Sequence, residues 1–165
     1  MEHFSKSSHL PVSHEEAFLW HKRPGALERM LPPWMPTEVV SSSGSIENNA
    51  LIHVKVSVGP AKFNFKVNHQ NFIQNVQFQD TQRQGPFKSW LHTHKFEPYG
   101  NEKSKITDEI DYELPLKFLT TWMGIISGWI RDGTTSAKLS FLKQTNRHFE
   151  IRRIQNPKSK IQNPI

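Results

Sequence analysis

Between residues 37 and 114, apolar and polar residues alternate with a period of two. In one segment, a single face is formed by Ile52, Val54, Val56 and Val58. The alternation continues over 61–69, 72–80, 87–96 and 105–114. Successive side chains of a strand point to opposite faces, so this pattern predicts an antiparallel meander with one buried face. The predicted turns lie at Gly44, Gly59-Pro60, Gln70-Asn71, Gly85-Pro86 and Pro98-Tyr99-Gly100.

Ahead of this meander, the sequence predicts a first strand over 4–11 and two short helices. Ser13 stands three residues before Glu16, which is the spacing of a capping box at the start of a helix. Pro24 ends that helix and suits the first turn of a second helix over 25–30.

After the meander, the sequence predicts further helix and then a tail. Segment 116–130 is apolar with helical spacing, and its two glycines favour a kinked helix or a flexible cover. A long amphipathic helix is predicted to begin after 134–136. The polar residues 155–165 include two prolines and show no periodicity, so we expect a disordered tail there. We therefore expect one α+β domain over 1–154.

Composition excludes several classes of function. The 165 residues include no cysteine, which excludes disulfides and thiolate metal sites. No apolar run reaches the roughly 18 residues of a membrane-spanning helix, and the N-terminus lacks a signal peptide's apolar stretch. We therefore expect a cytoplasmic protein without membrane insertion. The net charge is +6, but Lys143 and the residues after it carry six basic side chains against Glu150 alone, which accounts for +5. This local excess does not form a basic groove, so we expect no nucleic-acid binding.

The buried face of the predicted meander also carries ionisable side chains. By alternation they are His69, Asp80, His92, His94, Asp108 and Tyr112. A buried polar group without a partner costs about 1–3 kcal/mol, so these groups need each other, a ligand or water. A last turn centred near Gly100 places His92 opposite Asp108, and a slip of two residues places His94 there instead. In both registers a histidine lies beside a carboxylate, which raises the histidine pKa and fixes its tautomer.

Three interpretations of these residues stay open. They can form a self-satisfied, inert polar network. They can orient the polar end of an otherwise apolar ligand, with catalysis by a His–Asp pair as a special case. They can also hold a metal ion, because zinc sites use the spacing of His92 and His94, to which His69 could add a ligand. Two histidines on one strand are a weak signal, so we expect no metal ion and no cofactor.

Several motifs resemble a known superfamily. Residues 21–34 (H-x-R-P-G-A-L-E-R-M-L-P-P-W) are similar to the N-terminal signature of a cyclase/dehydrase-like subgroup of the START-like, or SRPBCC, superfamily. Residues 85–96 (G-P-F-x-x-W-x-H-x-H-x-F) resemble its central strand, 108–115 the next strand, and Arg147-His148 the end of its terminal helix. The resemblance implies a helix-grip fold. In this fold a curved antiparallel sheet of about six to seven strands, with two small helices after the first strand, wraps around a long C-terminal helix.

The resemblance also implies a function, because relatives bind lipids, polyketides, quinones or hormones. We therefore expect a small, mostly apolar ligand between the sheet and the C-terminal helix, with segment 116–130 as a possible gate. The predicted ligand contacts are Phe63, Phe65, Val67, His69, Phe78, Trp90, His92, His94, Asp108, Ile110 and Tyr112.

Two alternatives remain. The first is a cyclase, dehydratase or isomerase that uses His92 or His94 as general acid or base, held by Asp108. The second is a protein-interaction module with a filled core and a basic C-terminal end. Relatives also occur fused to epimerase-like domains, which makes an epimerase-like protein a candidate partner. No glycine-rich dinucleotide motif follows a strand in this chain.

Overall fold

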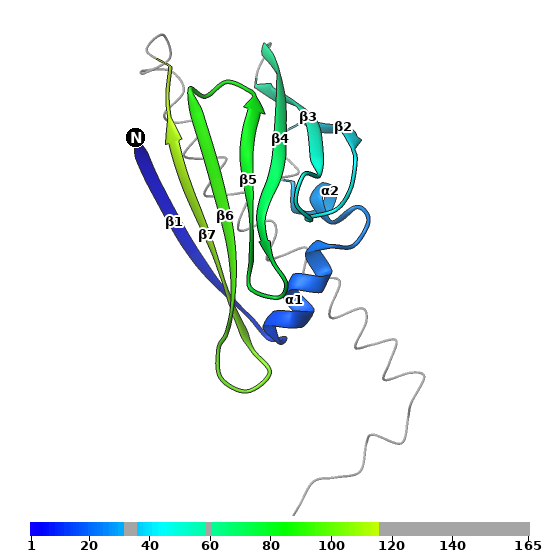
Figure 1. The fold of residues 1–165 in the computed structure, drawn as a ribbon, viewed down its shortest axis with the longest axis vertical. Coiled ribbons are helices and arrows are strands. Elements are labelled where there is room, and N and C mark those ends of the chain that lie inside the picture. Colours follow the sequence, from blue (N-terminus) through cyan, green and yellow to red (C-terminus); the bar gives the residue numbers. More distant parts are fainter. Residues whose placement is uncertain (32–35, 59–60, 116–165) are drawn as a thin grey trace, which may run out of the picture.

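The structure, a computed structural model, describes residues 1–31, 36–58 and 61–115 (Figure 1). In chain order its elements are β1 (Glu2–Leu10), α1 (His14–His21), α2 (Ala26–Met30), β2 (Thr37–Ser42), β3 (Leu51–Val58), β4 (Ala61–Ile73), β5 (Gln77–Gln84), β6 (Ser89–Pro98) and β7 (Ser104–Glu113). The predicted segment 116–130, the long terminal helix and the tail lie outside the described residues.

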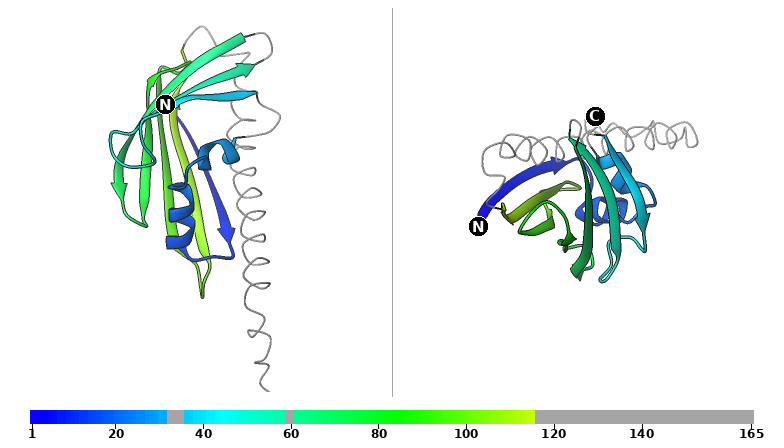
Figure 2. Two further views of the ribbon diagram at one scale, coloured as in Figure 1. Left: turned by 90° about the vertical axis from the view of Figure 1, so that its right-hand side faces the viewer. Right: turned by 90° about the horizontal axis from the view of Figure 1, so that it is seen from above.

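The strands form one antiparallel seven-stranded sheet in the order β1-β7-β6-β5-β4-β3-β2. From β2 onward each strand pairs with the next one in the chain, and β1 extends the sheet at the free edge of β7. The sheet is curved, and α1 and α2 lie on its concave side (Figure 2). The predicted curved sheet of six to seven strands with two small helices after the first strand is confirmed.

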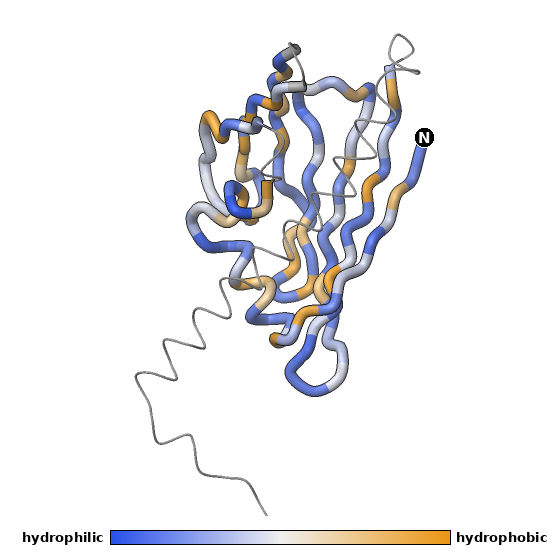
Figure 3. Tube along the Cα trace, turned by 180° about the vertical axis from the view of Figure 1, so that it is seen from behind, coloured by the Kyte–Doolittle hydropathy of each residue, from blue (hydrophilic) through white to orange (hydrophobic). Residues whose placement is uncertain are grey.

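The alternation of the sequence explains which face is buried. Hydrophobic and polar residues alternate along the strands (Figure 3). Val54, Phe65 and Val67 are buried, whereas Lys55 and Lys66 on the opposite face are exposed. Removing a large apolar side chain from water contributes about 1.5–3 kcal/mol, so the concave face gives much of the driving force for folding.

Helix α1 closes one end of the concave face. It begins as predicted, because the Ser13 hydroxyl accepts a hydrogen bond of 3.2 Å from the backbone N–H of Glu16. Phe18 and Trp20 of this helix are almost fully buried. The Phe18 ring meets the Phe96 ring of β6 edge-on, with 5.2 Å between ring centroids. This aromatic packing fixes the position of α1 and of the chain that leads into α2.

The predicted turn at Gln70-Asn71 is wrong. Strand β4 continues to Ile73, and the turn follows at 74–76. Asn71 stays within the strand with a φ of 49°, a left-handed conformation that Asn tolerates better than most residues. Because of this shift, Val76, which the alternation over 72–80 would place on the same face as Phe78, lies in the turn and is exposed.

The register between β6 and β7 follows the slipped alternative. His94 pairs with Asp108, so the register that places His92 opposite Asp108 is wrong. The reason is that the turn occupies 99–103 and is centred beyond Gly100. A slip of two residues leaves every side chain on its original face, so both histidines still lie on the concave side.

Candidate functional site

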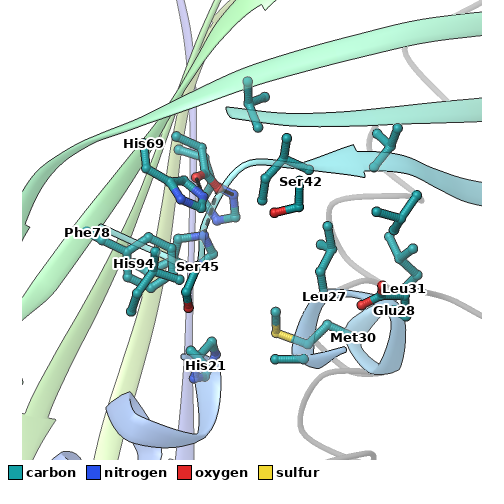
Figure 4. A pocket seen from close by; sticks show the side chains of 18 of the residues that line it. His21, Leu27, Glu28, Met30, Leu31, Ser42, Ser45, His69, Phe78 and His94 are labelled. Atoms are coloured by element: carbon teal, nitrogen blue, oxygen red, sulfur yellow. Dashed lines mark hydrogen bonds and ion pairs between the residues drawn. The ribbon is translucent and has the colours of Figure 1, made fainter. Parts of the chain in front are cut away.

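A cavity of about 660 Å³ lies between the concave face and the α2 region. Most of its walls are apolar, and their side chains include Leu27, Met30, Leu31, Val39, Ile52, Val54, Val56, Phe65, Val67, Trp90 and Ile110. Figure 4 shows the side chains of α2 facing a group of histidines across this space. The volume falls within the range of about 300–1,000 Å³ that is typical of small-molecule pockets. Among residues 1–31, 36–58 and 61–115, the side chains on the concave face therefore border a space large enough for a small molecule.

The predicted ligand contacts can be compared with the cavity wall. Those that line it are Phe65, Val67, His69, Phe78, Trp90, His92, His94, Asp108 and Ile110. Phe63 and Tyr112 do not line it. Phe63 pairs with Val56 towards the end of the β3–β4 hairpin, and Tyr112 packs its ring against Phe87. Alternation gave the correct face for these two residues, but the cavity ends before it reaches them.

The ionisable residues of the concave face meet at one end of the cavity. We call His69, Asp80, His92, His94 and Asp108 the His–Asp cluster. Asp80 lies at its centre because β5 runs between β4 and β6. In the sheet Asp80 pairs with His69 on one side and His92 on the other. The predicted site omits Asp80, although alternation already places it on the buried face.

His94 lies between the two carboxylates of the cluster. Its Nδ1 is 2.8 Å from Oδ1 of Asp108, and its Nε2 is 3.2 Å from Oδ2 of Asp80. An imidazole donates from both nitrogens only when it is protonated, so this geometry fits an imidazolium. Burial lowers the pKa of His94, but the hydrogen bonds and charges of Asp108 and Asp80 outweigh burial and raise it to about 9. The Phe78 ring stacks on the imidazolium at 4.3 Å between centroids.

Both carboxylates of the cluster are ionised. Burial alone would raise their pKa values, but hydrogen bonds from the histidines and the positive charge of His94 hold both pKa values far below the usual range. Nε2 of His69 contributes a contact of 2.7 Å to Oδ1 of Asp80. The end of the cavity thus holds two largely buried anions beside one fixed cation.

His92 makes longer contacts than His94. Its Nε2 is 3.4 Å from Oδ1 of Asp108, and its Nδ1 is 3.9 Å from Oδ2 of Asp80. Burial and the positive charge of His94 lower the pKa of His92, so its ring is neutral. Nε2 of His92 and Nδ1 of His69 are buried without a hydrogen-bond partner among the described residues. A molecule that reaches this end of the cavity can supply the missing partners.

His21, at the end of α1, is a cavity residue that the predicted site omits. Its Nδ1–H donates a hydrogen bond of 2.8 Å to the carbonyl oxygen of Ala17. A carbonyl oxygen can only accept, so Nε2 of the neutral ring carries no hydrogen. Burial outweighs this hydrogen bond and lowers the pKa of His21 to about 4, with a further contribution from the charge of His94. Its ring centroid lies 6.4 Å from that of His94. The only sequence signal for His21 is its place at the start of the 21–34 motif.

Sequence comparison decides the family. Residues 10–138 match the family described as polyketide cyclase/dehydrase and lipid transport. The chain belongs to this family. The predicted function, binding of a small and mostly apolar ligand, is supported by this membership and by the apolar walls of the cavity. No curated protein sequence matches the chain.

Solved structures agree on the fold. This polyketide cyclase/dehydrase family member is similar to the Zhui aromatase/cyclase from Streptomyces sp. R1128, with a TM-score of 0.70 at 7% identity over 90% of this chain and 95% of that one. It is also similar to a START superfamily protein from Mycobacterium smegmatis, with a TM-score of 0.66 at 14% identity over 87% and 98% of the two chains. For norcoclaurine synthase from Thalictrum flavum the TM-score is 0.64 at 14% identity over 87% and 86%. At such identities the likeness establishes the START-like fold alone.

Among the described residues, no helix has both the length and the apolar character needed to cross a membrane.

Proposed function

We propose that this family member binds an apolar molecule with one hydrogen-bonding head group, and that the head group lies against the His–Asp cluster. The observation that carries this proposal is that the cavity has apolar walls and one polar end. Its walls are apolar, while one end holds two carboxylates, an imidazolium and histidine nitrogens for which the described residues supply no hydrogen-bond partner. A pure hydrocarbon would leave those nitrogens unpaired, whereas a polar head group can pair with them.

A neutral hydroxyl fits the cluster better than a carboxylate. Both N–H groups of His94 are already directed at Asp80 and Asp108, so they are not free to donate to a ligand anion. A ligand carboxylate would be a third anion at this end of the cavity. A phenol or an alcohol can instead donate to one of the existing carboxylates. A hydrogen bond to a charged group contributes about 1.5–3 kcal/mol, or about tenfold or more in affinity.

The apolar body of the ligand would lie against the aromatic part of the wall. The Phe65 and Trp90 rings meet edge-on at 5.7 Å between centroids and form one side of the cavity. Ile110 on β7 is buried next to them in the same apolar cluster. Burial of apolar ligand surface contributes about 25 cal/mol per Å², so this wall sets the baseline affinity and the cluster sets the head-group preference.

The experiment compares three ligands of one ring size. Naphthalene, 2-naphthol and 2-naphthoate are titrated against the protein loaded with the neutral dye Nile red, and displacement gives their affinities. We expect 2-naphthol to bind about tenfold more tightly than naphthalene, and 2-naphthoate to bind least tightly. Asp108→Asn should reduce the preference for the hydroxyl. His3→Ala removes an exposed His–Asp pair on the outer part of the sheet and serves as the matched control. Tightest binding of 2-naphthoate would contradict the proposal.

Catalysis by proton transfer is a second candidate function, and Nε2 of His92 favours it. Among the described residues this nitrogen has no hydrogen bond of normal geometry, since Oδ1 of Asp108 is 3.4 Å away, and His92 lines the cavity. His94 has both nitrogens engaged by carboxylates, so it cannot accept a proton without breaking the network. We therefore propose His92, rather than His94, as the general base of a cyclisation or dehydration.

The test is dehydration of a β-hydroxy ketone by folded variants. His92→Gln should reduce turnover by about 10²–10⁴-fold, the usual contribution of general acid–base catalysis. Unchanged turnover in that variant would exclude His92 as the general base. An epimerase-like partner, the absence of nucleic-acid binding and a cytoplasmic location remain predictions.

A further inference from the structure

We propose that His92, His94 and Asp80 form a binding site for a divalent transition-metal ion such as Zn²⁺, with an open position towards the cavity. The sequence alone groups His92 and His94 with His69. The structure instead brings Asp80 between them, and this carboxylate changes the candidate ligand set. The proposal goes beyond the proposed function, which needs no metal ion.

The candidate ligand atoms already converge. Nε2 of His94 lies 3.2 Å from Oδ2 of Asp80, and Nδ1 of His92 lies 3.9 Å from the same oxygen. One ligand atom from each of the three residues lies within 4.8 Å of the others. Zinc binds nitrogen and oxygen ligands at about 2.0–2.2 Å, which separates tetrahedral ligands by about 3.3 Å. A small inward movement of His92 is therefore enough to close the site around an ion.

Asp108 occupies the position of an orienting carboxylate. Its Oδ1 is 2.8 Å from Nδ1 of His94 and 3.4 Å from Nε2 of His92. Each histidine therefore turns one nitrogen towards Asp80 and the other towards Asp108. Histidines that bind a metal almost always donate their second ring N–H to a carboxylate, a carbonyl or water. In the metal-bound form Nε2 of His92 therefore carries a hydrogen directed at Asp108, so this form excludes Nε2 as a general base. The cluster thus combines three ligand atoms with the outer carboxylate that metal sites use to orient them.

His69 steadies the carboxylate ligand from its other side. Nε2 of His69, on a side chain that is only 3% exposed, lies 2.7 Å from Oδ1 of Asp80. This contact leaves Oδ2 of Asp80 as the oxygen that faces His92 and His94. A ligand held by its neighbours needs little reorganisation when the ion binds, which favours affinity.

The ligand set selects the class of metal. Two imidazoles and one carboxylate suit Zn²⁺ and Fe²⁺, whereas Ca²⁺ and Mg²⁺ prefer sites made of oxygen ligands. Three protein ligands leave the fourth position of a tetrahedral ion open, and all three residues line the cavity. The hydroxyl or carbonyl oxygen of a cavity ligand can occupy that position in place of water.

The test measures metal binding directly on the full-length, tag-free chain. The protein is dialysed against micromolar Zn²⁺ at about pH 8, where His92 is neutral and the ion must displace one proton from His94, whose pKa is raised to about 9. Bound zinc is then counted by elemental analysis, and visible absorption of Co²⁺ added in its place reports four-coordinate nitrogen and oxygen ligation. We expect one ion per wild-type chain.

Variants locate the ion. His92→Ala and Asp80→Asn each remove a ligand and should abolish stoichiometric binding. Asp108→Asn should keep the site but weaken its affinity by about 10–100-fold, because it removes only the outer hydrogen bonds. His3→Ala, which removes an exposed His–Asp pair with a 2.8 Å contact, should bind zinc like the wild type.

Two outcomes overturn the proposal; the first uses the wild type alone, and the second uses variants shown to be folded by circular dichroism. The first is a folded wild-type protein that retains no zinc after dialysis. The second is loss of zinc in His3→Ala together with its retention in His92→Ala, which would assign the ion to surface histidines. Displacement of Nile red by 2-naphthol in the presence of EDTA tests the proposed function separately. Ligand binding without zinc binding would leave that function standing while removing the metal site.

Discussion

The buried His21 should make the protein lose stability in mild acid, and His21→Asn should remove this loss. The folded-state pKa of His21 is lowered from 6.5 to about 4, first because burial disfavours its charged form. The unfolded chain therefore takes up a proton on His21 as the pH falls below about 6.5, while the folded protein does not. The free energy of unfolding must then decrease between about pH 6.5 and 4.

The size of this loss follows from the two pKa values. One pKa unit corresponds to about 1.36 kcal/mol, so the separation between 6.5 and about 4 gives an upper limit of roughly 3 kcal/mol. By pH 5 the loss should already be about 2 kcal/mol. The charged groups that act on His21 are His94 on β6 and Asp108 on β7. Neither changes its charge in this range, because the pKa of His94 is raised to about 9 and that of Asp108 lies far below.

The assay is urea unfolding of the wild type and His21→Asn at several pH values between 7 and 4.5. The Asn amide can still donate to the Ala17 carbonyl oxygen but does not titrate. Any pH-independent change in the free energy of unfolding caused by the substitution cancels, because the comparison uses only how that free energy changes with pH in each protein. We expect the wild type to lose about 2 kcal/mol more than the variant between pH 7 and 5. Parallel loss of stability in the two proteins would refute a buried, neutral His21.

Three further predictions concern the cluster, the cavity and the first helix. The folded-state pKa of His94 is raised to about 9, so its stabilisation is complete below about pH 6.5 and is lost as the pH rises through 9. Urea unfolding between pH 6 and 10 should therefore show a decline in the wild type, of roughly 3 kcal/mol at most, that His94→Gln lacks. Val67→Trp places a large ring in the cavity wall. This variant should stay folded but no longer show displacement of Nile red by 2-naphthol. Unaltered binding of 2-naphthol would exclude this cavity as the binding site. Ser13→Ala removes the cap of α1 and should lower the free energy of unfolding by about 1 kcal/mol in a urea titration, whereas an unchanged value would mean that the cap is dispensable.

Alternation predicted the concave face well because successive side chains of a strand point to opposite faces, so a side chain's face depends only on whether its position in the strand is odd or even. Phe65, Val67, Trp90 and Ile110 all line the cavity for this reason. Even the wrong first register between β6 and β7 kept His92 and His94 on the correct face, since a slip of two preserves parity. The fold class therefore followed from the pattern without any knowledge of the exact strand pairs.

Turn positions were harder to predict because the chain offers the same signal twice. Gln-Asn occurs at 70–71 and again at 74–75, and neither pair contains glycine or proline. The structure turns at the second pair and keeps the first within β4. Packing decides between them, because the longer strand brings Phe72 against the α1 side chain Phe18, with 5.5 Å between ring centroids. No local feature of the sequence carries that information.

The composition of the cluster could be predicted only in part. That a histidine would meet a carboxylate followed from alternation, but which pairs form depends on the strand order and the register. Asp80 contacts histidines on both neighbouring strands only because β5 is placed between β4 and β6. His21 reaches the cavity from α1, through packing across the sheet, so strand periodicity could not identify it.

The energetics of the cluster argue against a purely structural role. Burying ionised groups in an apolar wall costs free energy that their mutual attraction only partly offsets, and apolar side chains of similar size are often at least as stable there. A self-satisfied network would also leave no buried nitrogen unpaired, yet Nε2 of His92 and Nδ1 of His69 lack hydrogen-bond partners within the part of the chain that the structure describes. These two atoms belong to residues that line the cavity, which is where a ligand head group or an ion would pair with them. Apolar residues of similar size could line the same cavity without loss of stability, so the arrangement of these residues is best explained by what they bind.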